Sequence, residues 1–513
     1  MGLEPAIWST RETSFSIAGF LLALLCAAAT PSAAAEPIDF MPVASVEPQI
    51  VAAALPPDYL DSPALVQIQY AQVNVTLLAS VLFDFDDEVV TLRLFENLEL
   101  ALVSASAIVR EEVGHRVWSG FVQAIVYGSA TLVLGPDSSL TGVIYLDERS
   151  FEIVPLGAEG LVAIIEWDGS NLPESAPPVY GSAGVDWQQD PAANASDWEV
   201  LEEKPVVTID VLSLYPREYL RNWCLDPVRM KAHELGLEAH AQRVLDYRWQ
   251  SDVAFDFTVV CLDETPPTGG TFSPADSTPT YHSLTWLRSS PGPFSPNPIE
   301  KLRDLYHADL VTLGVQTSDL CATDVTGQDP PKCVCGIGTY NDYREGFGLD
   351  PDAAFSVVGF SCTFPGYTLM HELGHNLGMH HDRQAEANGS ITAGENAAIL
   401  FSPACNFGRI VDVVPPPEAP ADFPTQFRTV MAYRDFCEGS CPRIGTYSTA
   451  LPVNAEVLFD NELFLVEDFV PGTSCLASPS VGFAGELLGN LYNRADNWRH
   501  LRNLTAPLVA GFR

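Results

Sequence analysis

The sequence predicts an α/β (α+β) domain with a mostly parallel, twisted sheet, preceded by a separate domain rich in β-strands. Three observations support this prediction. The chain has 513 residues, which is too many for one ordinary hydrophobic core. Short apolar runs separated by turn residues occupy its first part, whereas strand and helix patterns alternate in its second part. A stretch rich in proline and acidic residues lies between the two parts.

Residues 1–35 have the pattern of a cleaved signal peptide. The apolar run FSIAGFLLALLCAAAT at 15–30 leads into the small residues of PSAAAEP. Because this run is shorter than the ~20 residues of a spanning helix, a single membrane anchor is the disfavoured alternative. We predict cleavage after Ala35, a secreted product (extracellular or periplasmic) and no membrane insertion after the signal is removed.

Residues 36–178 are predicted to form the β-rich domain. Positions 130–169 alternate apolar runs with clusters of Gly, Pro, Asp and Ser. The domain has no cysteine, and its strands contain no catalytic cluster. The following stretch, 173–205, is rich in Pro, Ser, Ala and acidic residues, which predicts an exposed linker; we place the region of proteolytic processing at 179–205.

Residues 206–513 are predicted to form the α/β domain. The predicted order is strand, helix, strand, helix and strand, at 206–215, 228–249, 253–262, 297–307 and 308–315. This alternation favours a largely parallel sheet with helices packed on it.

Within this domain the letters HELG occur twice, and the first copy does not fit a metal site. Its histidines, His233 and His240, are seven residues apart on the predicted helix. That spacing is a rise of ~10.5 Å, whereas two ligands of one zinc ion each lie ~2.1 Å from it. We expect both histidines on the polar face of an amphipathic helix.

The second copy has the spacing of a metal site. His371 and His375 are four residues apart, so a helix places both imidazoles on one face. Glu372 lies beside the first of them, where its carboxylate can reach a water on the metal without binding the metal. Zinc needs a third ligand, and Gly378 can end the helix in a left-handed conformation that turns the chain back.

His380 and His381 are the two candidates for the third ligand. In an extended segment their side chains point to opposite sides, so only one can face the metal. The pattern HExxHxxGxxH selects His381.

This pattern, followed by Asp382, resembles the signature of metzincin zinc endopeptidases of the reprolysin-like branch. That branch also has a methionine turn, and RTVMAYRDFC at 428–437 places Met431 downstream of His381. The segments LRDLYHADLVTLGV, CVCGIGTY and AFSVVGFSC and the chain end NWRHLRNLTAPLVAGFR resemble exported bacterial metzincins of the peptidyl-Asp metalloendopeptidase type.

The resemblance implies a metzincin-like catalytic domain with one catalytic Zn²⁺ held by His371, His375 and His381. Met431 would form an apolar floor under the metal. The ion would polarise a peptide carbonyl and lower the pKa of its bound water toward ~7. Glu372 would take the proton of this water as general base and pass it to the leaving amine. Proteins or peptides are the implied substrates.

The N-terminal part shares in the resemblance, because RVWSGFV and LTGVIYLDERSFEIVPL are similar to the propeptides of these enzymes. This implies a zymogen in which 36–178 is the propeptide domain and 206–513 the catalytic domain. Since the propeptide has no thiol, a cysteine switch on the zinc is excluded, and a carboxylate or a steric block could serve instead.

Three further residues are candidates near the substrate. Tyr433 stands where some metzincins have a tyrosine that supports the oxyanion, although core packing is an equal alternative. Arg434 or Arg443 could recognise an acidic substrate side chain, whereas a surface ion pair, such as Arg434 with Asp435, is the simpler interpretation. The segment CGIGTYND at 335–342 is a candidate edge strand for an extended peptide, although its glycines could only mark a bend. The insert VVPPPEAPADFP at 413–424 departs from the family pattern and puts a transferred substrate preference in doubt.

Composition limits the partners and the compartment. A formal charge of −40 repels phosphate backbones, so nucleic acid is excluded as a partner and a solubilising surface is favoured. Loss of the signal peptide with Cys26 leaves ten cysteines, an even number that predicts disulfides of unspecified pairing. Cys333 and Cys335 are too close for a CxxC zinc knuckle. Calcium binding and oligomeric state stay open.

Two other classes of protein compete with a protease. One is an exported adhesion or carbohydrate-binding protein with a degenerate protease-like domain. The presence of His371, Glu372, His375, His381 and Met431 weighs against degeneration. The other is a zinc hydrolase that acts on non-peptide substrates, and the third histidine and the methionine turn weigh against it.

Overall fold

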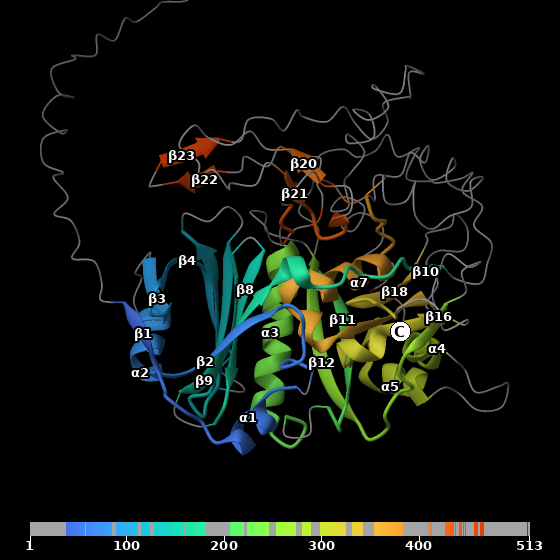
Figure 1. Cartoon of the computed structure of the whole chain (residues 1–513), viewed down its shortest axis with the longest axis horizontal. Helices are drawn as coiled ribbons and strands as arrows, with labels where there is room; N and C mark the ends of the chain where they lie inside the picture. Colours follow the sequence, from blue (N-terminus) through green and yellow to red (C-terminus); the bar gives the residue numbers. More distant parts are fainter. Residues whose placement is uncertain are drawn as a thin grey trace, which may run out of the picture.

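The computed structural model describes residues 37–180 and 206–382, with short gaps in both, parts of 408–465, and residue 510. The predicted signal peptide, the insert at 413–424 and the chain-end segment 497–513, apart from residue 510, therefore lie outside the described residues. Two bodies make up the described part, a barrel on the left of Figure 1 and a layered α/β domain on the right.

The N-terminal body is a closed barrel in the order β1-β2-β9-β8-β7-β6-β5-β4-β3. Its strands are β1 (Ile38–Pro42), β2 (Leu65–Val73), β3 (Val89–Phe95), β4 (Leu98–Arg110), β5 (His115–Val122), β6 (Ser129–Leu134), β7 (Leu140–Leu146), β8 (Arg149–Pro155) and β9 (Leu161–Asp168). Neighbouring strands are antiparallel, except that β1 pairs with β3 in parallel and thereby closes the barrel. The short helices α1 (Pro48–Ala54) and α2 (Val75–Ala79) lie in the connections.

Both faces of the strands β7 to β9 are buried. Side chains alternate along a strand, and on β8 Phe151 and Ile153 enter the core of the barrel, whereas Val154 faces away from it. On β9 Ala163, Ile165 and Trp167 also face away from the barrel and join a core shared with the second body. One wall of the barrel is therefore a docking surface for the α/β domain.

The α/β domain is built on a six-stranded sheet in the order β10-β18-β19-β15-β11-β12. Its strands are β10 (Val179–Tyr180), β11 (Val207–Pro216), β12 (Val253–Leu262), β15 (Leu310–Val315), β18 (Gly336–Tyr340) and β19 (Phe355–Gly359). Strands β12, β11, β15 and β19 are parallel, β18 is antiparallel to β19, and β10 is parallel to β18. Strand β15 is buried over its whole length, as its apolar run LVTLGV predicts.

Helices and smaller sheets complete the domain. The helices are α3 (Pro227–Leu245), α4 (His282–Arg288), α5 (Pro298–Tyr306), α6 (Phe360–Thr363) and α7 (Thr368–Asn376). A four-stranded sheet consists of β13 (Gly270–Phe272), β14 (Thr280–Tyr281), β16 (Cys321–Asp324) and β17 (Lys332–Cys333). Two strand pairs follow, β20 (Ile410–Asp412) with β21 (Gln426–Arg428) and β22 (Glu456–Phe459) with β23 (Glu462–Leu465).

Helix α3 lies between the barrel and the sheet, in green at the centre of Figure 1. The prediction that His233 and His240 lie on a polar face is wrong, because both imidazoles are buried. The reason is that α3 is covered on two sides, by β12 of the sheet and by β5 to β7 of the barrel. A helix that packs against two bodies at once has no wide solvent-facing side.

The predicted start of the linker is also wrong. Val179 and Tyr180 form β10 on the edge of the sheet, and the residues before them, from Leu172 onward, lie against the α/β domain with Ser175 and Ala176 buried. The compositional signal of an exposed linker therefore fails at 173–180, where nearby acceptors and cations satisfy the polar groups of the segment. Residues 181–205 lie outside the described residues.

Disulfide formation is confirmed in the described residues. The pairs are Cys224–Cys261, Cys321–Cys333, Cys335–Cys362 and Cys437–Cys441. Cys405 and Cys475 lie outside the described residues. In the described part of the chain, no helix is both long and apolar enough to cross a bilayer.

Candidate metal centre

Helix α7 carries the first two predicted metal ligands. Gly366 and Tyr367 precede it with φ values of 84° and 58°, so the chain enters the helix through a tight left-handed turn. The side-chain amide of Asn376 fixes the other end by donating to the carbonyls of Thr339 (2.9 Å) and Phe355 (3.0 Å) on the sheet. The helix is buried throughout and cannot rotate without breaking these bonds.

The turn after α7 brings the third histidine back to the first two. Gly378 has φ 76°, and its amide donates to the carbonyl of His375 at 2.9 Å, which ends the helix as predicted. His381 Nε2 then lies 2.9 Å from His375 Nε2 and 3.2 Å from His371 Nε2. Two ligands at ~2.1 Å from a tetrahedral ion are ~3.4 Å apart, so the three ring nitrogens have nearly the separation that such an ion needs.

The other ring nitrogens fix the orientation of the ligands. His371 Nδ1–H donates to the carbonyl of Val430, and His375 Nδ1–H to that of Met379, both at 2.8 Å. This tautomer leaves each Nε2 lone pair directed at the common centre, as in metal sites with oriented histidines. Burial first, and then the neighbouring His375, lower the pKa of His371, so its ring is neutral. The three histidines can therefore hold a metal ion.

His380, the competing candidate, is placed elsewhere. Its Nε2 lies 2.6 Å from the hydroxyl of Tyr340 on β18, and the two ring centroids are 4.3 Å apart. The described metal cluster contains His381 and not His380.

Glu372 is fully buried next to this cluster, against the edge strand β18. Burial raises its pKa to about 8, and the Ser175 hydroxyl and Arg443 partly oppose this increase. Both carboxylate oxygens lack a well-formed hydrogen bond among the described residues. The glycines of β18 leave room for it, because a Cβ at Gly336 would lie 2.6 Å from Oε1 and one at Gly338 3.1 Å from Oε2. This room for the carboxylate was not predicted from the sequence, where the glycines indicated a bend in a candidate edge strand.

Met431 and Tyr433 both lie near the histidines. The sulfur of Met431 is buried against α7 at Gly374. The ring of Tyr433 lies 3.9 Å from that of His381, and its amide donates to Asp382 at 3.0 Å. Its hydroxyl donates to the carbonyl of Ser175 at 2.9 Å, so this side chain has a polar partner and does not simply fill the core.

Three arginines surround one carboxylate beside the metal centre. Glu174 lies 3.0 Å from Arg443, 3.1 Å from Arg428 and 3.7 Å from Arg434. Burial opposes the ionisation of Glu174, but the three guanidiniums outweigh it and lower its pKa. We call Arg428, Arg434 and Arg443 the arginine clamp. Arg434 and Arg443 were candidates from the sequence, whereas Arg428 and Glu174 were not; Asp435, the suggested ion-pair partner of Arg434, lies outside the described residues.

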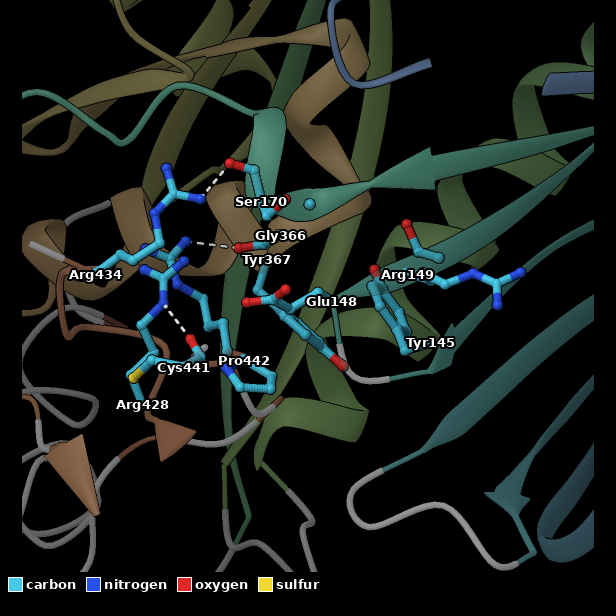
Figure 2. Close-up of a pocket in the computed structure, with 13 residues that line it drawn as sticks. Tyr145, Glu148, Arg149, Ser170, Gly366, Tyr367, Arg428, Arg434, Cys441 and Pro442 are labelled. Carbon is cyan, nitrogen blue, oxygen red and sulfur yellow. Dashed lines mark hydrogen bonds between the residues drawn. The ribbon is translucent and has the colours of Figure 1, made fainter. Parts of the chain in front are cut away.

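A pocket of about 380 Å³ lies next to the clamp, between the two bodies. Figure 2 shows Arg428 and Arg434 on one side of it and the barrel residues Tyr145, Glu148 and Arg149 on the other. Arg434 also donates to the carbonyl of Ser170, and Arg428 to that of Cys441. The barrel therefore closes a cationic pocket of the α/β domain.

Residues 172–180, here called the cleft segment, run along β18 and include the edge strand β10. The amide of Cys335 donates to the carbonyl of Glu174 (3.2 Å), and that of Ala176 to Gly336 (2.8 Å). Val179 pairs with Thr339 in parallel. The edge strand proposed from the sequence is thus occupied by an extended segment of the same chain, which comes from the N-terminal side.

The comparisons with known proteins add little to this description. No family model matches the chain, and no curated protein sequence matches it. Among solved structures, metalloproteinase-II from Bacteroides fragilis is similar with a TM-score of 0.34 and 13% identity, over 59% of this chain and 85% of that chain. At this level of similarity, function has to be inferred from the metal centre itself.

Proposed function

We propose that the protein is a zinc-dependent endopeptidase of the metzincin class, reprolysin-like and closest to the bacterial peptidyl-Asp metalloendopeptidase type, made as a zymogen. The observation that carries this proposal is the convergence of three Nε2 atoms beside a buried carboxylate that makes no well-formed hydrogen bond among the described residues. An adjacent sheet edge that accepts an extended chain supports a peptide as substrate.

His371, His375 and His381 would hold the zinc ion. When bound, zinc supplies a Lewis acid for the peptide carbonyl and lowers the pKa of water. Glu372 would accept the proton of the attacking water and deliver it to the leaving amine. The Tyr433 hydroxyl, which donates to a peptide carbonyl of the cleft segment, would donate to the oxyanion of the substrate.

The compartment is part of the proposal. Disulfides persist in oxidising environments, and the described part of the chain has four. Together with the predicted signal peptide, they support secretion.

The test uses the same substitution in both HELG segments. In processed chains from which residues 36–180 have been removed, Glu372→Gln should reduce casein hydrolysis by roughly 1000-fold, because the proton acceptor is lost. Zinc content should stay unchanged, since the carboxamide has the same size and is not a ligand. Glu234→Gln, on α3, is the matched control and should keep both activity and zinc.

Loss of zinc together with activity in Glu372→Gln would contradict the assignment of this residue. Absence of chelator-sensitive hydrolysis in every processed form of the wild-type chain would favour the exported binding protein instead.

We also propose that the arginine clamp recognises an acidic side chain of the substrate. Glu174 shows that the clamp accepts a carboxylate in nearly buried surroundings, since the side chains of Arg428 and Arg443 are only 8% and 6% exposed. A hydrogen bond to a charged group contributes about 1.5–3 kcal/mol, so Arg443→Gln should lower kcat/KM for acidic peptides by about tenfold or more. Neutral peptides should be affected much less. A peptide library without any preference for Asp or Glu would remove this proposal.

A further inference from the structure

The cleft segment belongs to the barrel and not to the linker that follows it. It begins four residues after the end of β9 at Asp168, whose side chain accepts from the amide and hydroxyl of Ser170 (2.9 and 2.5 Å). The predicted processing region comes after Tyr180. A cut within 181–205 therefore leaves the whole cleft segment attached to the barrel.

The cleft segment covers several parts of the proposed machinery at once. Its backbone uses the edge of β18 through Ala176 and Val179. The Ser175 carbonyl accepts a hydrogen bond from the hydroxyl of Tyr433 at 2.9 Å, and the Ser175 side chain is buried beside Glu372. A substrate peptide cannot use the same edge while this segment lies there.

Glu174 is the strongest anchor of the cleft segment. Its carboxylate is only 19% exposed and contacts all three arginines of the clamp, and charge-assisted bonds of this kind are stronger in desolvated surroundings. Pro173 and Pro177 flank the anchored residues and restrict the segment to extended conformations before it binds. A restricted segment loses less conformational entropy when it is held in the cleft.

The barrel also contacts the α/β domain independently of the cleft segment. The Tyr145 hydroxyl on β7 donates to the carbonyl of Phe364 at 2.5 Å, immediately before the turn into α7. Trp223 donates to the carbonyl of Ala54 at 2.9 Å, and the amide of Thr317 to Asp58 at 2.9 Å. These contacts, and the apolar core shared by the two bodies, are independent of residues 181–205.

We propose that the N-terminal part, residues 36–180, stays bound after processing as an inhibitory subunit, with Glu174 as the residue that holds the cleft closed. A single cut in 181–205 then produces a two-chain, latent complex, and activity appears only after a second event removes the cleft segment. This inference rests on the proposed function, because the cleft that is closed is the proposed active site.

The experiment places a recognition sequence for a specific protease between positions 185 and 200 of the full chain. After complete cleavage, gel filtration in native buffer shows whether the two fragments stay together. Peptide hydrolysis and amide hydrogen exchange of the peptides that cover 172–180 and 336–340 are measured on the same samples. Glu174→Ala tests the anchor, and Glu99→Ala, which removes an exposed ion pair with Arg93 on the barrel, is the matched control.

The cleaved wild-type chain and the cleaved Glu99→Ala control should both co-elute as two fragments and hydrolyse peptides slowly. Cleaved Glu174→Ala should also co-elute, because the other contacts remain, but it should hydrolyse peptides at least about tenfold faster. Its amides in 172–180 should lose their protection against exchange. Separation of the wild-type fragments on cleavage, or equal activity of the wild type and Glu174→Ala, would overturn the proposal.

Hydrogen exchange separates this proposal from the proposed function. If no form hydrolyses peptides, but Glu174→Ala alone loses protection at 172–180, the endopeptidase proposal fails and the anchored cleft segment stands. If protection at 172–180 is the same in all three cleaved proteins, Glu174 is not the anchor, whatever the activity.

Discussion

The two HELG helices of this chain share four letters and differ in everything that chemistry requires. On α3, His233 and His240 are buried between two bodies, and each contacts one tyrosine hydroxyl, of Tyr215 at 2.9 Å and of Tyr145 at 3.1 Å. On α7, the histidines face each other and a third one behind a glycine turn. The comparison teaches that the chemistry depends on ligand spacing and on where the chain reverses, and not on the shared letters.

The glutamates of the two helices make the same point. Glu234 pairs with Lys231 and accepts from the amide of Val259 at 3.2 Å, so its carboxylate is satisfied. Glu372 is fully buried without a well-formed hydrogen bond in the described part of the chain, and its pKa is raised to about 8. A satisfied carboxylate stabilises a fold, whereas an unsatisfied one next to a metal centre is available to move protons.

The largest expected difference between the helices is in metal binding. His375→Ala should remove a ligand from the convergent site, so we expect loss of zinc and, with it, about a 1000-fold or greater loss of hydrolysis. His240→Ala should keep the zinc, because its ring is not part of the site. It should instead lower the free energy of unfolding by about 2–4 kcal/mol, as other large-to-small changes in cores do. Metal analysis measures the zinc content of both variants, and urea unfolding measures their free energy of unfolding.

Equal zinc loss in the two variants would show that α3 supports the metal centre indirectly. Tyr145→Phe is the control for the tyrosine contact of His240. It removes that contact without opening a cavity.

The convergence of the three histidines could be predicted from the sequence because their geometry is local. A four-residue spacing on a helix and one left-handed glycine determine where His371, His375 and His381 meet. The clamp could not be predicted in this way. Arg428 and Glu174 are 254 positions apart, and they meet only because the cleft segment crosses the edge of the sheet.

The fold shows the same limit. The five elements predicted between 206 and 315 follow from apolar periodicity and agree with the described elements to within a few residues, and the predicted end of the second of them, at 246–249, lies outside the described residues. Strands β13 and β14 and helix α4 were not predicted. Closure of the barrel depends on the pairing of Ile38 with Leu92, and His240 is buried against Tyr145 of a barrel that docks from outside the domain. Neither contact leaves a periodic signal in the segment concerned.

The second expected difference is in the pH dependence of stability. Burial lowers the pKa of His233 to about 4 and that of His240 to about 3. The imidazoles of the unfolded chain bind protons as the pH falls through about 6.5, whereas those of the folded chain stay neutral. The free energy of unfolding is therefore highest above pH 6.5 and decreases as the pH falls. Each histidine should lower the free energy of unfolding by about 2 kcal/mol when the pH decreases from 7 to 5.

Urea unfolding at pH 5, 6 and 7 measures this loss. His240→Phe should make the slope shallower than in the wild type, because one of the two proton-binding groups of the unfolded state is gone. Tyr145→Phe keeps the imidazole and should keep the wild-type slope. Identical slopes in wild type and His240→Phe would mean that His240 is not held neutral by burial.

The smallest expected difference is between the two glycines of the HELG segments. A Cβ at Gly374 would meet the sulfur of Met431 and lie 3.3 Å from the ring of Tyr447. Gly374→Ala should therefore displace Met431 and destabilise the fold by about 1–3 kcal/mol. A Cβ at Gly236 would meet only Phe364, at 4.0 Å, which is an ordinary contact. Alanine is a better helix former than glycine, so Gly236→Ala should be stabilising by about 0.5–1 kcal/mol. Thermal unfolding of the two variants gives the sign of each change, and destabilisation by both would show that α3 is packed as tightly as α7.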